Sequence, residues 1–212
     1  TLNRTTNGKG LASDFTLDEI KKLFLRNGAG CKTRHKVPTF EEVMTLCKGK
    51  VMVNIDKGYD YFKEAYAILE KTGTVNQCVI KSDHPYGKVV LENGEVLKKM
   101  LFMPVVNLDE EDAEKIIEDY IVNLKPMVFE LIFKNDSPDV LRLIEKVRAS
   151  GAKIWINTLW PELCGGHDDD RAVELKDLEG SWGWVVKHGA KLIQTDRPIL
   201  LLDYLNKNKL RK

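Results

Sequence analysis

Residues 127–158 read MVFELIFKNDSPDVLRLIEKVRASGAKIWINT, and this stretch decides the fold class. The apolar run MVFELIF predicts a buried strand, and the periodic segment after it predicts an amphipathic helix. Ser137 can cap that helix, Pro138 suits its first position, and Gly151 suits its exit. The second apolar run, KIWINT, predicts another strand. Strand, helix and strand in this order are typical of a parallel sheet covered by helices.

The same alternation recurs through most of the chain. Six short apolar runs are each followed by a stretch with helical periodicity. The runs lie at 51–56, 77–82, 101–107, 127–133, 153–158 and 191–195. Two α/β architectures fit: an open doubly wound sheet, and a (β/α)8 barrel of which about two strands are missing. No glycine-rich nucleotide-binding motif follows any of the runs, which argues against the folds that carry one.

The first 48 residues differ from the rest of the chain, because no segment in them has a convincing strand pattern. They predict two short helices instead, TLDEIKKLFL and PTFEEVMTL. Each begins with the spacing of a capping box, Thr16 with Glu19 and Thr39 with Glu42.

Composition limits the classes of partner. The chain has 33 basic and 32 acidic side chains, so no charge surplus points to nucleic acid. No apolar run approaches about 18 residues, so we expect no transmembrane segment. The four cysteines lack metal-site spacing and are expected to be free or buried thiols. We predict a small-molecule ligand; localisation and oligomeric state stay open.

Polar side chains at the carboxyl ends of the strands are the candidate site, because both architectures bind ligands there. Asp56 closes the first strand, and its carboxylate suits a hard cation such as Ca²⁺ or Mg²⁺. A helix cap or a salt bridge with Lys57 explains it equally well. Lys81 closes the second strand and could bind a phosphoryl oxygen, or be an ordinary rim lysine.

Glu130 lies inside the apolar fourth strand, where a carboxylate is costly without a partner. Lys81 or a metal ion could be that partner. Trp155, in the fifth strand, and Trp160 could wall a ligand site or serve only in packing.

Other polar groups are assigned structural roles. The loop CGGHDDDRA, residues 164–172, is expected to be solvated and to cap the next helix. Asp196 is expected to be the N-cap of the last helix. His35, His84 and His188 have no partner pattern.

Three stretches resemble the glycerophosphodiester phosphodiesterase family, whose members are (β/α)8 barrels. TLNRTTNGKGLASDFTLDEIKKL, residues 1–23, resembles the family's Arg-Thr-Thr-x-Gly-x-Gly loop and the helix after it. VPTFEEVM followed by VMVNID resembles the helix and strand that come next. WINTLW and GAKLIQTDRPILLLDYL resemble the family's last two strands and closing helix.

The resemblance implies that strands three to eight of the barrel are present in a single domain spanning 1–212. Residues 1–48 would precede the third strand, and 49–212 would form the β/α units. The family's His-Arg, Glu-x-Asp and His-Asp motifs lie before the segment matched by Thr1, so no catalytic histidine is assigned here. We therefore expect this chain alone to be inactive or nearly so.

Matched position by position, Asp56 corresponds to a metal-binding carboxylate that is usually Glu in the family. Trp155 corresponds to the family's substrate-wall tryptophan. The family often has a lysine at the position of Gly58, and Lys57 is expected to face away. We predict that Lys81 takes over phosphate binding and that Glu130 also lies at the substrate.

The activity implied is hydrolysis of glycerophosphodiesters, with Ca²⁺ or Mg²⁺, to an alcohol and glycerol 3-phosphate, within lipid and glycerol metabolism. A non-catalytic α/β module that binds phosphate or sugar is the alternative. An unrelated sugar-phosphate isomerase barrel also fits the alternation, but the glycine-rich opening of the chain argues against it.

Overall fold

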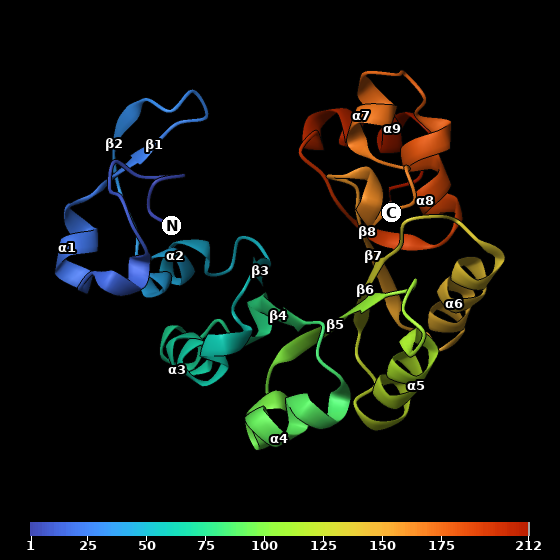
Figure 1. Cartoon of the computed structure of the whole chain (residues 1–212), viewed down its shortest axis with the longest axis horizontal. Helices are drawn as coiled ribbons and strands as arrows, with labels where there is room; N and C mark the ends of the chain where they lie inside the picture. Colours follow the sequence, from blue (N-terminus) through green and yellow to red (C-terminus); the bar gives the residue numbers. More distant parts are fainter. Residues whose placement is uncertain (212) are drawn as a thin grey trace. The chain divides into compact units, whose positions relative to one another are not determined.

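The computed structural model describes residues 1–211 (Figure 1). Its contacts divide the chain into two compact units. One comprises Thr1–Val51 and Ala67–Thr74, and the other comprises Met52–Tyr66 and Val75–Lys212. Each unit is described by itself below, and helix α3 (Phe62–Thr72) contributes residues to both.

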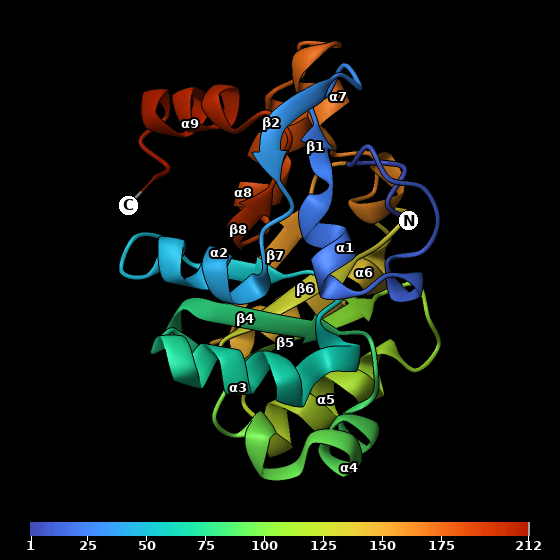
Figure 2. The same ribbon diagram turned by 90° about the vertical axis from the view of Figure 1, so that its left-hand side faces the viewer.

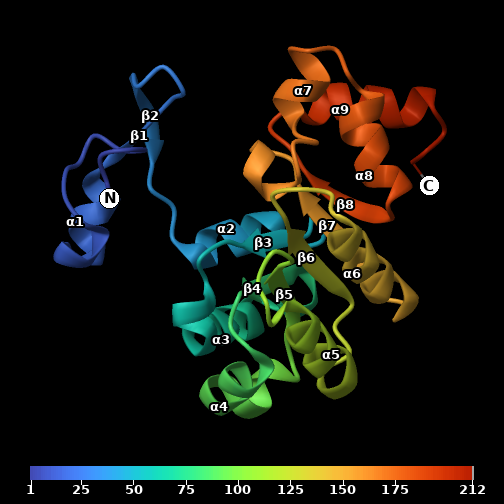
Figure 3. The same cartoon turned by 45° about the vertical axis from the view of Figure 1, so that its right-hand side comes forward.

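The larger unit contains a six-stranded sheet with the strands in chain order and every neighbouring pair parallel. The strands are β3 (Val53–Ile55), β4 (Cys78–Ser82), β5 (Leu101–Asn107), β6 (Val128–Ile132), β7 (Lys153–Asn157) and β8 (Ala190–Gln194). Five of them lie within the runs expected from the sequence, and β8 begins one residue before its run. The sheet curls as part of a barrel, and Figure 3 shows β6, β7 and β8 along the curl. The (β/α)8 prediction, with six strands present, is confirmed.

Helices follow the strands and cover one face of the sheet, where α5 packs on β5, α6 on β7 and α8 on β8 (Figure 1). In Figure 2, β4 and β5 lie side by side. The helical segments of this unit, besides part of α3, are η2 (Tyr59–Tyr61), η3 (Val75–Gln77), α4 (Tyr86–Leu97), α5 (Ala113–Asn123), α6 (Pro138–Ala149), η4 (Pro161–Leu163), α7 (Asp169–Val173), η5 (Glu179–Gly183), α8 (Trp184–Lys187) and α9 (Pro198–Lys207).

The core lies between this outer face and the helices. Ile80 is the sheet partner of Phe102, and both are buried. Phe102 stacks on Tyr120 of α5, with ring centroids 5.9 Å apart, so this face of the sheet points to the helices. Side chains alternate across a strand, so the residues between these core positions point to the inner, concave face.

Several predicted details of α6 and of the cysteines are confirmed. Ser137 accepts a hydrogen bond from the Val140 amide, and Pro138 opens the helix. Gly151 follows the helix with a φ of 86°, a conformation that favours glycine. None of the four cysteines forms a disulfide bond with another described residue. Within residues 1–211, each helix is too short or too polar to cross a lipid bilayer.

In the smaller unit, both predicted helices form: α1 (Leu17–Lys22) and α2 (Phe40–Cys47). Both capping boxes are complete, because Thr16 and Thr39 exchange hydrogen bonds with the glutamates three residues later. The expectation that this region has no strand is wrong. Strands β1 (Phe24–Arg26) and β2 (Lys32–Lys36) form an antiparallel hairpin. The hairpin is largely exposed and polar, so no apolar alternation marks it in the sequence.

Candidate active site at the carboxyl ends of the strands

The candidate site centres on the ammonium group of Lys81, which lies near two carboxylates. Its Nζ atom is 2.8 Å from Glu130 Oε2 and 3.7 Å from Asp56 Oδ1. The side chains of Glu130 and Lys81 are 2% and 15% exposed, whereas that of Asp56 is 67% exposed. The cluster therefore has a buried side, formed by Glu130, and an open side, formed by Asp56.

The register of the sheet explains why these three residues meet. Asn54 is the partner of Val79, so the positions two residues later, Asp56 and Lys81, follow on the same face. Glu130 is paired with Val105 and with Trp155 across the two neighbouring ladders. The side chain of Lys81 is long enough to reach across the intervening strand β5. The predicted pairing of Lys81 with Glu130 is confirmed.

Asp56 lies where the chain leaves β3. Lys57, the next residue, has a φ of 53°, which turns the backbone sharply after the carboxylate. Asp56 is within ion-pairing distance of Lys81. The simpler reading of Asp56, a salt bridge with Lys57, is therefore not what the structure shows.

Trp155 lies on the concave face beside Glu130, and its register partner on the other side is Leu192. Its indole Nε1 atom is buried and has no hydrogen-bond partner among residues 1–211. Asn54 Oδ1 and Gln194 Oε1 are buried and unpaired in the same way. Buried polar atoms are nearly always paired, so the concave face is unusual in holding three of them.

Comparison with known proteins finds a family profile, a curated relative and solved structures that are similar to parts or most of this chain. A family profile described as a domain of unknown function matches residues 102–205. A glycerophosphodiester phosphodiesterase from Caldanaerobacter subterraneus subsp. tengcongensis is 47% identical over 62 residues, which cover 26% of this chain. The match spans about a quarter, 24%, of that relative's length.

Two solved structures match nearly the whole chain. A glycerophosphoryl diester phosphodiesterase from Parabacteroides distasonis superposes with a TM-score of 0.76 at 23% identity, covering 98% of this chain and 69% of that one. A putative glycerophosphodiester phosphodiesterase from Galdieria sulphuraria gives a TM-score of 0.67 at 13% identity, covering 97% and 76%.

This chain has the fold of the glycerophosphodiester phosphodiesterases. The resemblance drawn from the sequence motifs is thus confirmed, and the carboxyl edge of the strands is where a phosphodiesterase barrel would bind its ligand.

The loop that follows β7 differs from expectation, because it is not solvated. His167, Asp168 and Asp169 are 4%, 7% and 3% exposed. Asp168 does cap α7, as predicted, by accepting from the amides of Asp170 and Arg171. The π-helical turn η5 packs on α7, and helix α8 packs on η5. The sequence does not distinguish Asp168, Asp169 and Asp170, and only this packing shows which of them are buried.

Asp169 holds this edge of the phosphodiesterase fold together. Its carboxylate accepts four hydrogen bonds: from Thr158 Oγ1 at 2.7 Å, Trp182 Nε1 at 2.9 Å, and Thr195 Oγ1 and the Asp196 amide at 2.8 Å each. Sequence reasoning did not single out this residue.

The expectation that Asp196 caps the last helix is wrong. The N-cap of α9 is Arg197, which makes no side-chain capping bond, and the Asp196 amide is used by Asp169 instead. Asp169 accepts hydrogen bonds from both Thr195 and the Asp196 backbone, so its buried carboxylate stabilises the turn before α9.

Two histidines also have partners that the sequence did not reveal. His167 stacks on Trp184 with centroids 3.8 Å apart, and its Nε2 is 3.5 Å from Asp136 Oδ2. His188 stacks on the same tryptophan, at 3.9 Å. The contacts of His167 join residues that lie far apart in the chain, so no local motif signals them, whereas Trp184 and His188 are four residues apart in the chain.

A metal ion has only a partial set of ligands in the part of the chain described. Among residues 1–211, no three His, Cys, Asp or Glu side chains lie together as a metal site requires. Asp56 offers one exposed carboxylate, and Glu130 is engaged by Lys81. Among the described residues, the free carboxylate of this cluster is therefore that of Asp56, which alone does not make up a set of metal ligands.

Proposed function

We propose that this protein hydrolyses glycerophosphodiesters to an alcohol and glycerol 3-phosphate. The observation that carries the proposal is the cluster of Asp56, Lys81 and Glu130 on the concave face of a sheet with the phosphodiesterase fold. The matched relatives are named as phosphodiesterases of this kind. Each of them is longer than the part that matches this chain. The proposal therefore concerns the natural protein that contains this chain.

Lys81 is the residue that we assign to the phosphoryl group. Its ammonium forms an ion pair with the buried carboxylate of Glu130, so the ammonium is oriented before a ligand binds. A cation fixed in a poorly solvated site stabilises charge on phosphoryl oxygens more strongly than a mobile one in water. Glu130 acts through Lys81 and is a positioning residue in this scheme.

The charge of the cluster supports a cation requirement. Two carboxylates and one ammonium sum to −1, which repels a phosphodiester anion. A divalent cation at Asp56 would bring the sum to +1 and would act as a Lewis acid. We therefore retain Ca²⁺ or Mg²⁺ as the proposed cofactor, with Asp56 as one ligand, because both ions prefer oxygen donors.

Trp155 would form an apolar wall beside the glycerol unit, next to Glu130 in the sheet. The proton transfers of the reaction are assigned to no residue of this chain. Within residues 1–212, the assigned roles are therefore binding and positioning.

The test compares three forms of the natural protein: wild type, Lys81→Met, and Lys88→Met as a control from the neighbouring helix α4. Glycerol 3-phosphate release from glycerophosphocholine is measured with Ca²⁺, with Mg²⁺ and with a chelator. We expect turnover by wild type and by the control, and a loss of at least about 100-fold in Lys81→Met. Binding of glycerol 3-phosphate without turnover of any glycerophosphodiester would contradict the proposal and favour a non-catalytic module.

A further inference from the structure

The β1–β2 hairpin of the smaller unit is strongly basic. Between Glu19 and Glu41, the sequence carries six lysine or arginine side chains and no acidic one. We propose that this hairpin binds the surface of a membrane that contains anionic phospholipids. The charge of the hairpin carries the inference, and the choice of a phospholipid surface over another polyanion rests on the proposed function.

Charge is unevenly distributed along the chain. Residues 1–51 carry ten basic and five acidic side chains, whereas residues 52–212 carry 23 basic and 27 acidic ones. The near-neutral total is therefore the sum of a positive amino-terminal part and a negative remainder. Such asymmetry is typical of a chain that meets a charged surface with one of its parts. An anionic membrane would attract residues 1–51 and repel the rest.

The basic side chains of the hairpin have no counter-charge in the part of the chain described. Arg26, Lys32, Arg34 and Lys36 are all exposed. None of the four forms an ion pair with another described residue. In Figures 1 and 3 the hairpin extends away from α1 of the same unit. Because no carboxylate has to be displaced, the charge of these four side chains is available to an anionic surface.

The register of the hairpin places part of this charge on one side. Arg26 is paired with Lys32, and Phe24 is paired with Lys36. The ammonium groups of Lys32 and Lys36 lie 4.1 and 3.5 Å from the centroid of the Phe24 ring, so the ring binds both cations. Because lysines occupy this ring, it does not offer the free aromatic face on which nucleic-acid bases stack.

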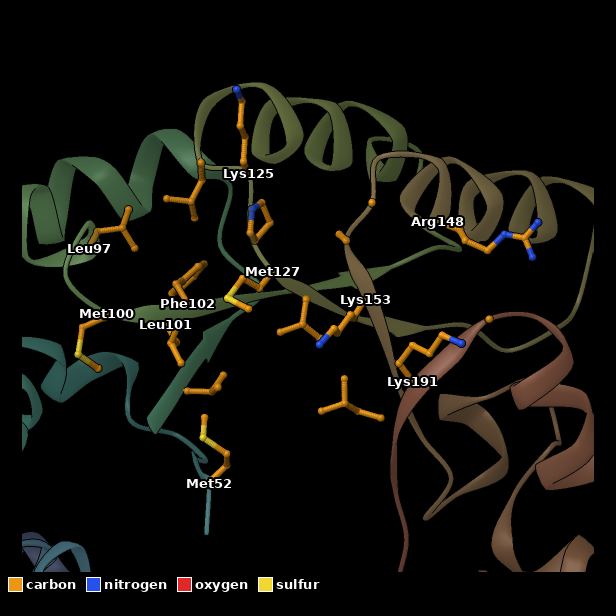
Figure 4. Close-up of a pocket in the computed structure, with 18 of the residues that line it drawn as sticks. Met52, Leu97, Met100, Leu101, Phe102, Lys125, Met127, Arg148, Lys153 and Lys191 are labelled. Atoms are coloured by element: carbon orange, nitrogen blue, oxygen red, sulfur yellow. The ribbon is translucent and has the colours of Figure 1, made fainter. Parts of the chain in front are cut away.

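The unpaired lysines of the larger unit are a different case. Lys125, Lys153 and Lys191 lie near the amino-terminal ends of the strands (Figure 4). Those strands form only part of a barrel, so the exposure of these lysines does not indicate a partner. The hairpin differs, because both of its strands are present and are paired with each other.

A phospholipid surface is the anionic partner that fits the proposed chemistry. A glycerophosphodiester is what remains of a phospholipid when its acyl chains are removed. The class of reaction that supplies the proposed substrate is therefore ester hydrolysis of phospholipids, which lie in a membrane. Attraction of lysine and arginine to anionic head groups requires no fixed geometry, and this suits charges that are spread over both strands of a hairpin.

The experiment is co-sedimentation of the natural protein with lipid vesicles. Vesicles of phosphatidylcholine with about 30% phosphatidylglycerol are compared with vesicles of phosphatidylcholine alone. We expect binding to the anionic vesicles only, and loss of that binding at about 1 M NaCl, where the Debye length is about 3 Å. Equal binding to both kinds of vesicle, or binding that salt does not weaken, would overturn the inference.

A pair of double variants localises the binding. Arg26→Gln with Arg34→Gln removes two charges and leaves both lysine contacts with Phe24 in place. Each lysine or arginine near an anionic membrane contributes about fivefold to the partition coefficient, so this variant should bind about 25-fold more weakly. Lys115→Gln with Lys207→Gln, an equal charge change at exposed positions of the larger unit, should bind like wild type. Equal binding by all three proteins would contradict the assignment to the hairpin.

Two controls complete the experiment. Circular dichroism spectra of the variants must match wild type. If the arginine double variant is disturbed, Arg34→Glu replaces it, because this single change also alters the charge by two units. Binding of a single-stranded oligonucleotide without any binding to anionic vesicles would assign the hairpin to nucleic acid and overturn the inference.

Turnover of glycerophosphocholine separates this inference from the proposed function. This substrate is soluble and carries no net charge, so its hydrolysis does not require a membrane. A protein that hydrolyses it without binding anionic vesicles would contradict the membrane inference alone. A protein that binds the vesicles through the hairpin without hydrolysing any glycerophosphodiester would contradict the proposed hydrolysis alone.

Discussion

Lys81 and Glu130 form an ion pair across the concave face of the sheet, between strands β4 and β6, which are not neighbours. The Nζ–Oε2 distance is 2.8 Å, and the carboxylate is almost fully buried. The side chain of Lys81 lies over β5 to reach its partner. This contact fixes the position of a cation near the carboxyl ends of the strands, where Asp56 lies 3.7 Å from the same ammonium.

The pair should be costly to break from one side. Lys81→Met leaves Glu130 buried without a counter-charge, so we expect the free energy of unfolding to fall by about 3–5 kcal/mol. The double variant Lys81→Met, Glu130→Leu removes both charges and should recover most of that loss. Urea denaturation followed by circular dichroism measures both. Lys98→Met, which breaks the exposed Lys98–Glu95 pair, is the control and should have little effect. Equal free energies of unfolding for the single and the double variant would contradict this, because an unpaired Glu130 would then carry no cost.

Asp169 should be a stability centre of the carboxyl edge. In Asp169→Asn, one carboxylate oxygen becomes an amide that cannot accept the hydrogen bonds it received, so buried donors lose their acceptor. We expect a loss of about 3 kcal/mol in the free energy of unfolding, measured by urea denaturation. Asp170→Asn, one residue away and 75% exposed, is the matched control and should keep the wild-type midpoint. Equal midpoints for the two variants would contradict the four-donor arrangement.

The stability of the α5–α6 surface should depend on acid pH through Glu114. Hydrogen bonds from Arg142 and Lys146 lower the pKa of Glu114 from 4.5 to about 2. Because the folded pKa is the lower one, the stabilising contribution is present above about pH 4.5 and is lost as pH falls toward 2. The difference in urea midpoint between wild type and Glu114→Gln should therefore shrink from pH 7 to pH 2.5. A difference that stays constant over this range would mean that Glu114 titrates normally.

Much of the fold follows from local patterns. The six apolar runs predict the six parallel strands because each is short, continuous and followed by helical periodicity, as at 127–151. The pairs Thr16–Glu19 and Thr39–Glu42 predict helix starts because capping needs only a spacing of three residues. The pairing of Lys81 with Glu130 was also predictable, since a carboxylate inside an apolar strand requires a partner.

Other features depend on contacts that no local pattern encodes. The β1–β2 hairpin has a polar sequence and is stabilised by backbone pairing, so it lacks the alternation of a half-buried strand. Asp169 is buried where η5 packs on α7, and Trp182 of η5 donates a hydrogen bond to it, whereas Asp170 stays exposed. The same carboxylate accepts a hydrogen bond from the Asp196 amide in the turn before α9, whose N-cap is Arg197.

The most direct test of the account is the activity of Asp56→Asn in the natural protein. Asp56 is 67% exposed, so the substitution should leave the fold intact while removing the carboxylate proposed to bind the cation. With glycerophosphocholine and Ca²⁺ or Mg²⁺, we expect kcat/KM to fall at least about 100-fold. The circular dichroism spectrum should be unchanged, and Asp60→Asn should retain wild-type turnover. Wild-type kcat/KM in Asp56→Asn would contradict the proposed site.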